Sequence, residues 1–327
     1  MKTISRYFRP IILGITLAVL LVFVLQFSGF FNIPVNQDTQ NPYEYNLDDL
    51  KNIKPELLKW NESFTVPIHI KYPKAIAIDK YDKIYICGEK QVVIYDSNMD
   101  IAKNFEIPIA GRSIFVDHEQ KIYLGMQGQL HIFSDSGSLI SKFNQLSNKT
   151  VITSIAANEN FIFVADAGKR IVWKLDLSGK VISQIGEKDP SRDIPGFIIP
   201  SPYFDLGFDN VGQLWVVNPG RHFLENYSFN GDLKTHWGKT SNQVHGFCGC
   251  CNPSHFAILS NGSFITSEKG LERVKEYSVT GQLMSVVAGP YSFDEGTVGL
   301  GLAVDSHDRV FVLDPSRKQI RIFVRKN

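Results

Sequence analysis

Apolar and polar residues alternate over short runs through most of the chain, and these runs come in sets. Near the end of the chain, residues 302–305, 309–314 and 319–323 form three such runs, separated by polar turns. Alternation combined with β-branched and aromatic residues predicts β-strands. Three strands within about 23 residues cannot bury both faces of a sheet, so the set requires neighbours of its own kind.

Five earlier sets repeat the pattern at a spacing of roughly 40 to 50 residues, the range of solenoids and propellers. Each of these five continues into a fourth run after a turn that contains Gly or Asn. The first runs of the six sets cover residues 75–79, 113–117, 154–157, 206–209, 256–259 and 302–305. The pattern therefore predicts an all-β, six-bladed β-propeller of four-stranded antiparallel blades.

Residues 63–70 alternate like a strand but precede the first set, whereas the last set has only three strands. We expect the strand 64–70 to become the fourth strand of the last blade and to close the ring, because closure removes an exposed sheet edge. A β segment outside the ring is the alternative. The propeller would then comprise residues 63–327.

The first 62 residues follow a different pattern. Residues 1–10 carry three cations and no acid, residues 11–31 are almost unbroken apolar sequence, and residues 32–62 form a polar spacer. A helix of about 20 apolar residues spans a ~30 Å hydrocarbon layer. No small-residue cleavage site follows, so an uncleaved transmembrane anchor is favoured over a cleaved signal peptide. The basic flank predicts a cytoplasmic N-terminus and an extracytoplasmic propeller, in the periplasm or at the cell surface.

Composition excludes several classes of protein. Aromatic residues are 12% and charged residues 20% of the chain, which is typical of a folded protein. The net charge of +1 argues against a nucleic-acid partner. Four cysteines are too few for a disulfide scaffold. The sequence contains neither a phosphate-binding glycine loop nor a serine nucleophile elbow.

The repeat resembles the NHL family, in which an apolar strand ends in Asp and a basic loop later precedes an R-I-x-x-F/Y strand. Residues 166–173 (DAGKRIVW) and 314–323 (DPSRKQIRIF) match best, and the resemblance spans about residues 73–323. Residues 247–253 (FCGCCNP) are also similar to a bacterial NHL-repeat subgroup with a Cys-Gly-Cys-Cys-Asn-Pro loop. The resemblance implies the six-bladed fold but no particular activity, since such propellers include lyases, lactonases and binding modules.

One rim of the central channel should gather two kinds of loop, those that lead into the innermost strands and those that join second to third strands. Convergent loops on a rigid scaffold favour a binding site. Five of the six second-to-third loops carry a cation, which favours an anionic ligand. The candidate ligand-binding residues are Arg170, Arg221, His222, Lys269, Arg273 and Arg317. Arg170 and Arg273 could instead be structural residues whose stems pack between blades.

Residues 245–255 (HGFCGCCNPSH) contain three of the four cysteines and lead into the fifth innermost strand. One interpretation is a local disulfide, for which Cys248–Cys251 is the feasible pair. A second is a zinc or copper site with ligands from Cys248, Cys250, Cys251, His245 and His255. A third is thiol redox chemistry at a strained, exposed disulfide. Adjacent cysteines bond only with strain and seldom bind one ion together, and the sequence leaves the three interpretations open.

The leading hypothesis is a binding or scaffold module whose basic, cysteine-containing rim holds an anionic small molecule, a peptide or a partner protein. The alternative is an enzyme at the same rim, either a metal-assisted lyase or hydrolase or a thiol redox protein. Its candidate catalytic residues are His222, His255 and Glu268, with Arg221 as an anion clamp. Zinc or copper are the candidate cofactors, and no motif requires either.

Overall fold

The structure, a computed structural model, describes residues 14–21, 23–24 and 47–326. Residues 14–21 and 23–24 are helical. The rest of the predicted anchor 11–31 lies outside the described residues, as do the flank 1–10 and residues 32–46 of the spacer. No helix within the described ranges is both long and apolar enough to cross a membrane. Residues 47–326 begin with α2 (Leu47–Lys51) and the 3-10 turn η1 (Pro55–Leu57), and the strands follow.

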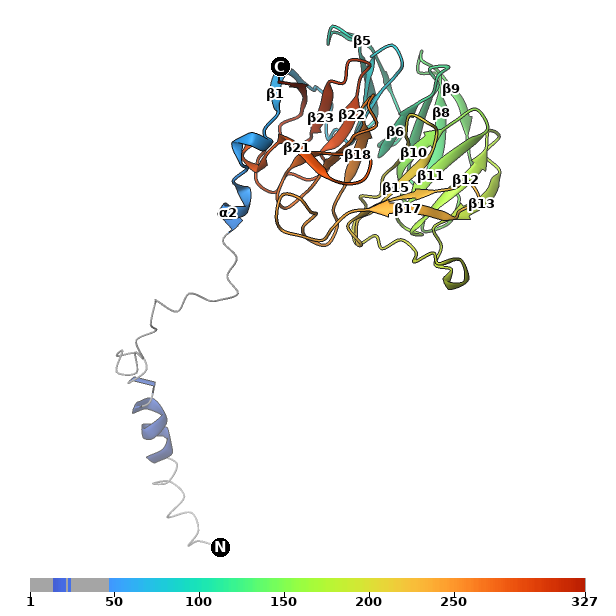
Figure 1. Ribbon diagram of the computed structural model, residues 1–327. Coiled ribbons are helices and arrows are strands. Elements are labelled where there is room, and N and C mark those ends of the chain that lie inside the picture. Colours follow the sequence, from blue (N-terminus) through green and yellow to red (C-terminus); the bar gives the residue numbers. More distant parts are fainter. Residues whose placement is uncertain (1–13, 22, 25–46, 327) are drawn as a thin grey trace, which may run out of the picture. The chain divides into compact units, whose positions relative to one another are not determined.

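Six four-stranded antiparallel sheets make up the body of the protein (Figure 1). Blade 1 consists of β2 (Ala75–Ile78), β3 (Ile84–Cys87), β4 (Gln91–Tyr95) and β5 (Ile101–Glu106). Blade 2 consists of β6 (Ser113–Val116), β7 (Ile122–Met126), β8 (Gln129–Phe133) and β9 (Leu139–Lys142). Blade 3 consists of β10 (Ile152–Ala157), β11 (Phe161–Asp166), β12 (Ile171–Asp176) and β13 (Val181–Ile185).

The second half of the ring repeats this order. Blade 4 consists of β14 (Leu206–Phe208), β15 (Leu214–Asn218), β16 (Phe223–Tyr227) and β17 (Leu233–Trp237), after the turn η2 (Pro190–Arg192). Blade 5 consists of β18 (His255–Ile258), β19 (Phe264–Ser267), β20 (Val274–Tyr277) and β21 (Leu283–Ala288). Blade 6 consists of β22 (Gly301–Val304), β23 (Val310–Asp314), β24 (Gln319–Arg325) and β1 (Trp60–Pro67), with η3 (Pro290–Ser292) before it.

The first strand of each blade lies innermost, next to the first strands of its neighbours. Strand β2 contacts β6 and β22, β10 contacts β6 and β14, and β18 contacts β22. The predicted six-bladed fold is therefore confirmed, and the channel runs along these six strands. Because strands in a blade are antiparallel, loops that enter the innermost strands lie at one end of the channel and loops that leave them lie at the other.

The ring closes inside blade 6, where the strand nearest the start of the propeller pairs with the last strand. Strand β1 is antiparallel to β24, with Phe64 opposite Ile322. It covers Trp60–Pro67 and so begins before, and ends before, the predicted strand 64–70. Burial explains the earlier start, because the Trp60 side chain is only 5% exposed and its indole N–H donates to Ser285 Oγ at 3.0 Å in blade 5.

An aspartate that ends the innermost strand gives the repeat its characteristic pattern. In blade 1, Asp79 Oδ1 accepts hydrogen bonds from two backbone N–H groups of the following turn, and Oδ2 accepts one from the Tyr85 hydroxyl at 2.9 Å. The carboxylate thus fixes the turn and ties it to the second strand. Equivalent pairs are Asp117–Tyr123 in blade 2 and Asp209–Trp215 in blade 4.

The same turns also join neighbouring blades, at the end of the channel opposite the cysteine-containing loop. Asp82 of blade 1 accepts hydrogen bonds from the backbone N–H and hydroxyl of Ser306 in blade 6, at 2.9 and 2.6 Å. Asp308 of blade 6 accepts the same pair from Ser260 in blade 5, at 2.7 and 2.6 Å. A repeated interblade contact of this kind resists separation of the blades.

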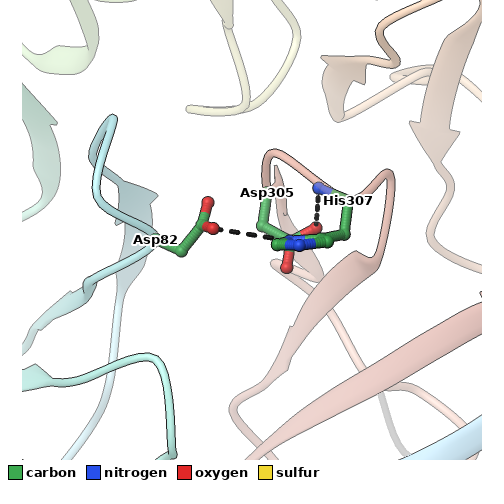
Figure 2. A group of neighbouring side chains, drawn as sticks. All are labelled: Asp82, Asp305 and His307. Carbon is green, nitrogen blue, oxygen red and sulfur yellow. Dashed lines mark hydrogen bonds and ion pairs between the residues drawn. The ribbon is translucent and has the colours of Figure 1, made fainter.

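Asp82, Asp305 and His307 are the group of described residues whose ligand atoms lie close enough for a metal ion (Figure 2). Both oxygens of Asp305 are already engaged, because Oδ1 accepts from the backbone N–H groups of His307 and Arg309 and Oδ2 pairs with the Arg309 guanidinium at 2.5 Å. Asp82 is likewise held by Ser306. The group is therefore part of the contact between blades 6 and 1.

Candidate ligand site at the channel mouth

Residues from all six blades line a cavity of about 360 Å³ at the end of the channel where the innermost strands begin. Pro73, Pro202, Val298 and Pro315 supply apolar surface. The polar lining residues, one from each blade in ring order, are Lys74, Arg112, Thr153, Tyr203, His255 and Ser316. The residues from blades 1 to 5 lie at or just before the starts of the innermost strands, and Ser316 lies on the second-to-third loop of blade 6.

Lys74 and Arg112 are the cations of this cavity. Each directly precedes the innermost strand of its blade, β2 or β6, and each is exposed. Within residues 47–326, neither side chain has a hydrogen-bond or ion-pair partner. Two unpaired cations beside low-dielectric walls produce a positive potential at the mouth. The sequence prediction considered only cations on second-to-third loops and missed both, although their shared position just before a first strand could have identified them.

His255 begins β18 and presents a partly buried imidazole to the cavity. Its ring meets that of Tyr203 edge to face, with centroids 5.8 Å apart. Burial lowers the pKa of His255, and the nearby Asp205 carboxylate opposes this only in part. The imidazole is therefore neutral near pH 7 and can accept a proton.

Asp205 lies beneath the mouth and lines a smaller space of about 60 Å³ together with Lys74, Arg112 and His255. Its oxygens accept hydrogen bonds from Ser154 Oγ at 2.6 Å, from the backbone N–H of Leu206 at 3.0 Å and from that of Phe256 at 3.0 Å. Burial raises its pKa despite these bonds and the nearby imidazole. Asp205 thus holds the starts of β10, β14 and β18 together and leaves the cations of the mouth without an exposed counter-charge.

The residues of the cysteine-containing loop point in different directions. Cys248 is buried beside Arg273, with its Sγ 3.7 Å from Nη2, whereas Cys250 and His245 are exposed. All four cysteines of the chain are free thiols. The predicted Cys248–Cys251 disulfide is thus not formed, and the five predicted metal ligands (Cys248, Cys250, Cys251, His245 and His255) are not brought together as a group within the described residues.

The loop is held by hydrogen bonds from both sides. The Asn252 amide donates to the carbonyls of Cys248 at 2.7 Å and Lys269 at 2.9 Å and accepts from the Lys269 backbone N–H at 3.0 Å. His222 Nε2 lies 2.6 Å from the carbonyl of Gly249, and its Nδ1 lies 2.7 Å from Thr240 Oγ1. A carbonyl only accepts, so Nε2 carries the proton. His222, predicted as a ligand-binding and catalytic residue, instead positions the loop.

Glu268 and Arg273 form the centre of a buried charged cluster rather than part of an open rim. Arg273 donates to both oxygens of Glu268, at 3.1 and 2.9 Å, and the Lys275 ammonium lies 2.5 Å from the same carboxylate. All three side chains are fully buried. Arg273 therefore cannot meet a ligand, as the structural alternative for this residue anticipated, and Glu268 is a counter-ion rather than an acid or base.

The other predicted rim cations have mixed surroundings. Arg317 pairs with Asp294 at 2.7 Å, and the Arg221 guanidinium stacks over Phe223 at 5.4 Å and lies 4.0 Å from Glu225. Arg170 is exposed. Lys269 donates to Ser201 Oγ at 3.3 Å and lies over the Tyr203 ring, 5.1 Å from its centroid. It therefore contacts Tyr203, which lines the cavity, but does not line the cavity itself.

The buried cluster should make stability depend on pH through Lys275. Burial lowers its pKa to about 8, against the attraction of Glu268. Between pH 8 and the ordinary pKa of 10.5, Lys275 binds a proton in the unfolded chain but not in the folded protein. The contribution of Lys275 to the free energy of unfolding therefore rises with pH in this range. From pH 7 to pH 10, the free energy of unfolding of the wild type should rise by about 2–3 kcal/mol relative to Lys275→Met. Urea denaturation at each pH measures this, and parallel profiles would contradict it.

No family model and no curated protein matches the chain. Solved structures do match in fold. A streptogramin B lyase superposes with a TM-score of 0.57 at 11% identity, covering 84% of this chain and 100% of that one. Virginiamycin B lyase from Staphylococcus aureus gives 0.56 at 10% identity over 81% and 99%, and a protein of unknown function from Bacteroides caccae gives 0.53 at 12% over 68% and 83%. At these identities the likeness establishes the propeller fold alone, and the NHL resemblance stays a prediction.

Proposed function

We propose that this propeller binds a small organic anion in the channel mouth. The observation that carries the proposal is that Lys74 and Arg112, from neighbouring blades, line one cavity that no acidic residue lines, and neither has an ion-pair partner among the described residues. A volume of about 360 Å³ suits a small molecule, since ligand pockets measure roughly 300–1,000 Å³.

The lining also suggests which anion fits. Arg binds a carboxylate or phosphate through two parallel hydrogen bonds, and Lys adds a point charge. Opposite these cations, Tyr203 and Pro202 offer an aromatic and apolar surface, and His255 can exchange one hydrogen bond. A carboxylate or phosphate ester with an apolar body matches this distribution better than a fully polar ion does.

The test is a binding screen of organic carboxylates and phosphate esters by isothermal titration calorimetry. For any molecule that binds, Arg112→Ala and Lys74→Ala should each weaken binding at least about tenfold, or 1.4 kcal/mol. The midpoint of unfolding should stay within a degree or two, because both side chains are exposed and unpaired. Arg317→Ala is the matched control, since that guanidinium is occupied by Asp294. Equal losses in all three variants, or none in the first two, would refute the site.

Acid–base catalysis on the bound anion is a second candidate function. Among the structures of similar fold is a catalytically inactive histidine variant of virginiamycin B lyase with quinupristin. In this chain His255 is the histidine that lines the mouth, and its imidazole is neutral near pH 7. Mass spectrometry of a binding molecule after incubation separates the two functions, because only an enzyme changes the molecule, and His255→Ala would abolish that change.

The predicted anchor at residues 11–31 and the location outside the cytoplasm stay predictions from the sequence. In that location a peptide or a partner protein could also present a carboxylate to the mouth.

A further inference from the structure

Cys250 and Cys251 form a chemical site that the anion-binding proposal does not use. Their Sγ atoms lie 3.1 Å apart, about 1 Å longer than an S–S bond. Cys250 is exposed to solvent, whereas Cys251 is only 3% exposed. We propose that this pair is a reversible thiol–disulfide exchange site, which exchanges electrons with small disulfides and dithiols and closes to a Cys250–Cys251 disulfide.

The surroundings of Cys251 favour its thiolate, the reactive form of cysteine. Burial acts in the opposite direction, but hydrogen bonds from Lys269, Ser201 and Cys250 hold the pKa of the Cys251 thiol below its usual range. The proton between the two sulfurs raises the pKa of Cys250. Of the two thiols, Cys251 is therefore the one that ionises more readily, with the Lys269 cation beside it and solvent beside Cys250.

The other two cysteines lack these properties. Cys87 is fully buried in blade 1, and burial raises its pKa to about 12. Cys248 is buried against Arg273 and Glu268, and burial together with the Glu268 carboxylate raises its pKa. Only the Cys250–Cys251 pair therefore combines access, a second thiol within contact and a nearby cation.

Because Cys250 and Cys251 are neighbours in sequence, a disulfide between them suits thiol–disulfide exchange better than a permanent cross-link. Consecutive Cα atoms lie about 3.8 Å apart, below the 4.4–6.8 Å usual for disulfides. A strained and exposed disulfide opens easily in the presence of thiols. The loop meanwhile keeps its shape through Asn252 and His222, whose hydrogen bonds do not involve either sulfur.

The reaction with a small disulfide R–S–S–R has two steps. Cys250 passes its proton to the Cys251 thiolate, and its own sulfur attacks R–S–S–R, forming a mixed disulfide and releasing RS⁻. Cys251 then attacks Cys250 Sγ and expels the second RS⁻, and the proton it held moves to a released thiolate. The protein dithiol is oxidised by two electrons, and the small disulfide is reduced to two thiols. A dithiol reverses the sequence.

The test treats the reduced full-length protein with glutathione disulfide and maps its cysteines by mass spectrometry. The wild-type peptide that contains Cys250 and Cys251 should become lighter by two hydrogen atoms and return to its original mass with dithiothreitol. Cys250→Ser and Cys251→Ser should each stop at a mixed disulfide with glutathione. Cys87→Ser and Cys248→Ser should behave as wild type.

Three outcomes would overturn the proposal. In the first, the wild type keeps glutathione as a stable adduct on Cys250. In the second, its new disulfide involves Cys248 or joins two protein molecules. In the third, the protein remains reduced under conditions that oxidise the free amino acid cysteine. The wild-type measurement alone decides these, so a variant that folds poorly does not obscure the answer. Because anion binding is measured with Arg112→Ala and not with thiol reagents, either proposal can fail while the other stands.

Discussion

Replacing Glu268 by glutamine is expected to lower the free energy of unfolding by about 3–5 kcal/mol. Glu268 is the counter-charge of two fully buried cations, Arg273 and Lys275, and also accepts the backbone N–H of Cys248 at 3.2 Å. An amide keeps the shape of the carboxylate but leaves both cations without compensation. The loss is comparable with a large part of a domain's total stability of about 5–15 kcal/mol.

Urea denaturation followed by tryptophan fluorescence measures the change. Asp294→Asn is the control, because Asp294 pairs with Arg317 at 2.7 Å while both side chains remain well exposed. Exposed pairs contribute about 0–1 kcal/mol, so this variant should unfold almost as the wild type does. If both variants lose the same small amount, the buried cluster does not depend on its carboxylate.

Removing β1 is expected to abolish the cooperative unfolding of the propeller. A chain that starts at Lys71 lacks Trp60, Val66 and Ile68, which are 5%, 5% and 3% exposed. Burial of each such side chain stabilises the fold by about 1.5–3 kcal/mol, so the sum approaches the stability of the whole domain. The truncation also leaves β24 as an unpaired edge that can associate with other chains.

Differential scanning calorimetry and sedimentation velocity would compare chains that start at Lys71 and at Leu47. The longer chain should melt in one sharp transition as a single species, whereas the shorter one should melt broadly and aggregate. A synthetic peptide covering residues 58–70 should restore the sharp transition when added to the shorter chain. An unchanged melting curve without β1 would show that the ring does not need its fourth strand in blade 6.

The sequence was sufficient for the fold because alternation reports directly on which face of a strand is buried. Blade 1 shows this, since Ile84 and Ile86 lie in one cluster and Tyr85 and Cys87 in the next. The limits of β1 were less accurate, because Trp60 belongs to the strand through a contact with blade 5 that no local pattern records.

The site was harder to predict because the availability of a charge depends on partners that are not neighbours in sequence. Arg317 and Arg273 look alike in their loops, yet one pairs with Asp294 at the surface and the other with Glu268 in the interior. Lys74 and Arg112 share a position just before a first strand, but the sequence does not show that both side chains lack an acidic partner and line one cavity. The spacing of the cysteines limits which pairs can bond, but it does not show in which direction each sulfur points.

The closure of the ring has a mechanical consequence. The chain enters the propeller through β1, which is held to β24 at seven paired positions from Trp60–Arg325 to Pro67–Gln319. A pulling force on the residues before Leu47 is therefore borne first by β1, through its pairing with β24 and its contact with Ser285 of blade 5, before it reaches blades 1 to 4. The resistance of the whole protein to stretching is set where β1 meets β24 and β21, and a partner that stiffens or loosens β1 would change it without touching the channel.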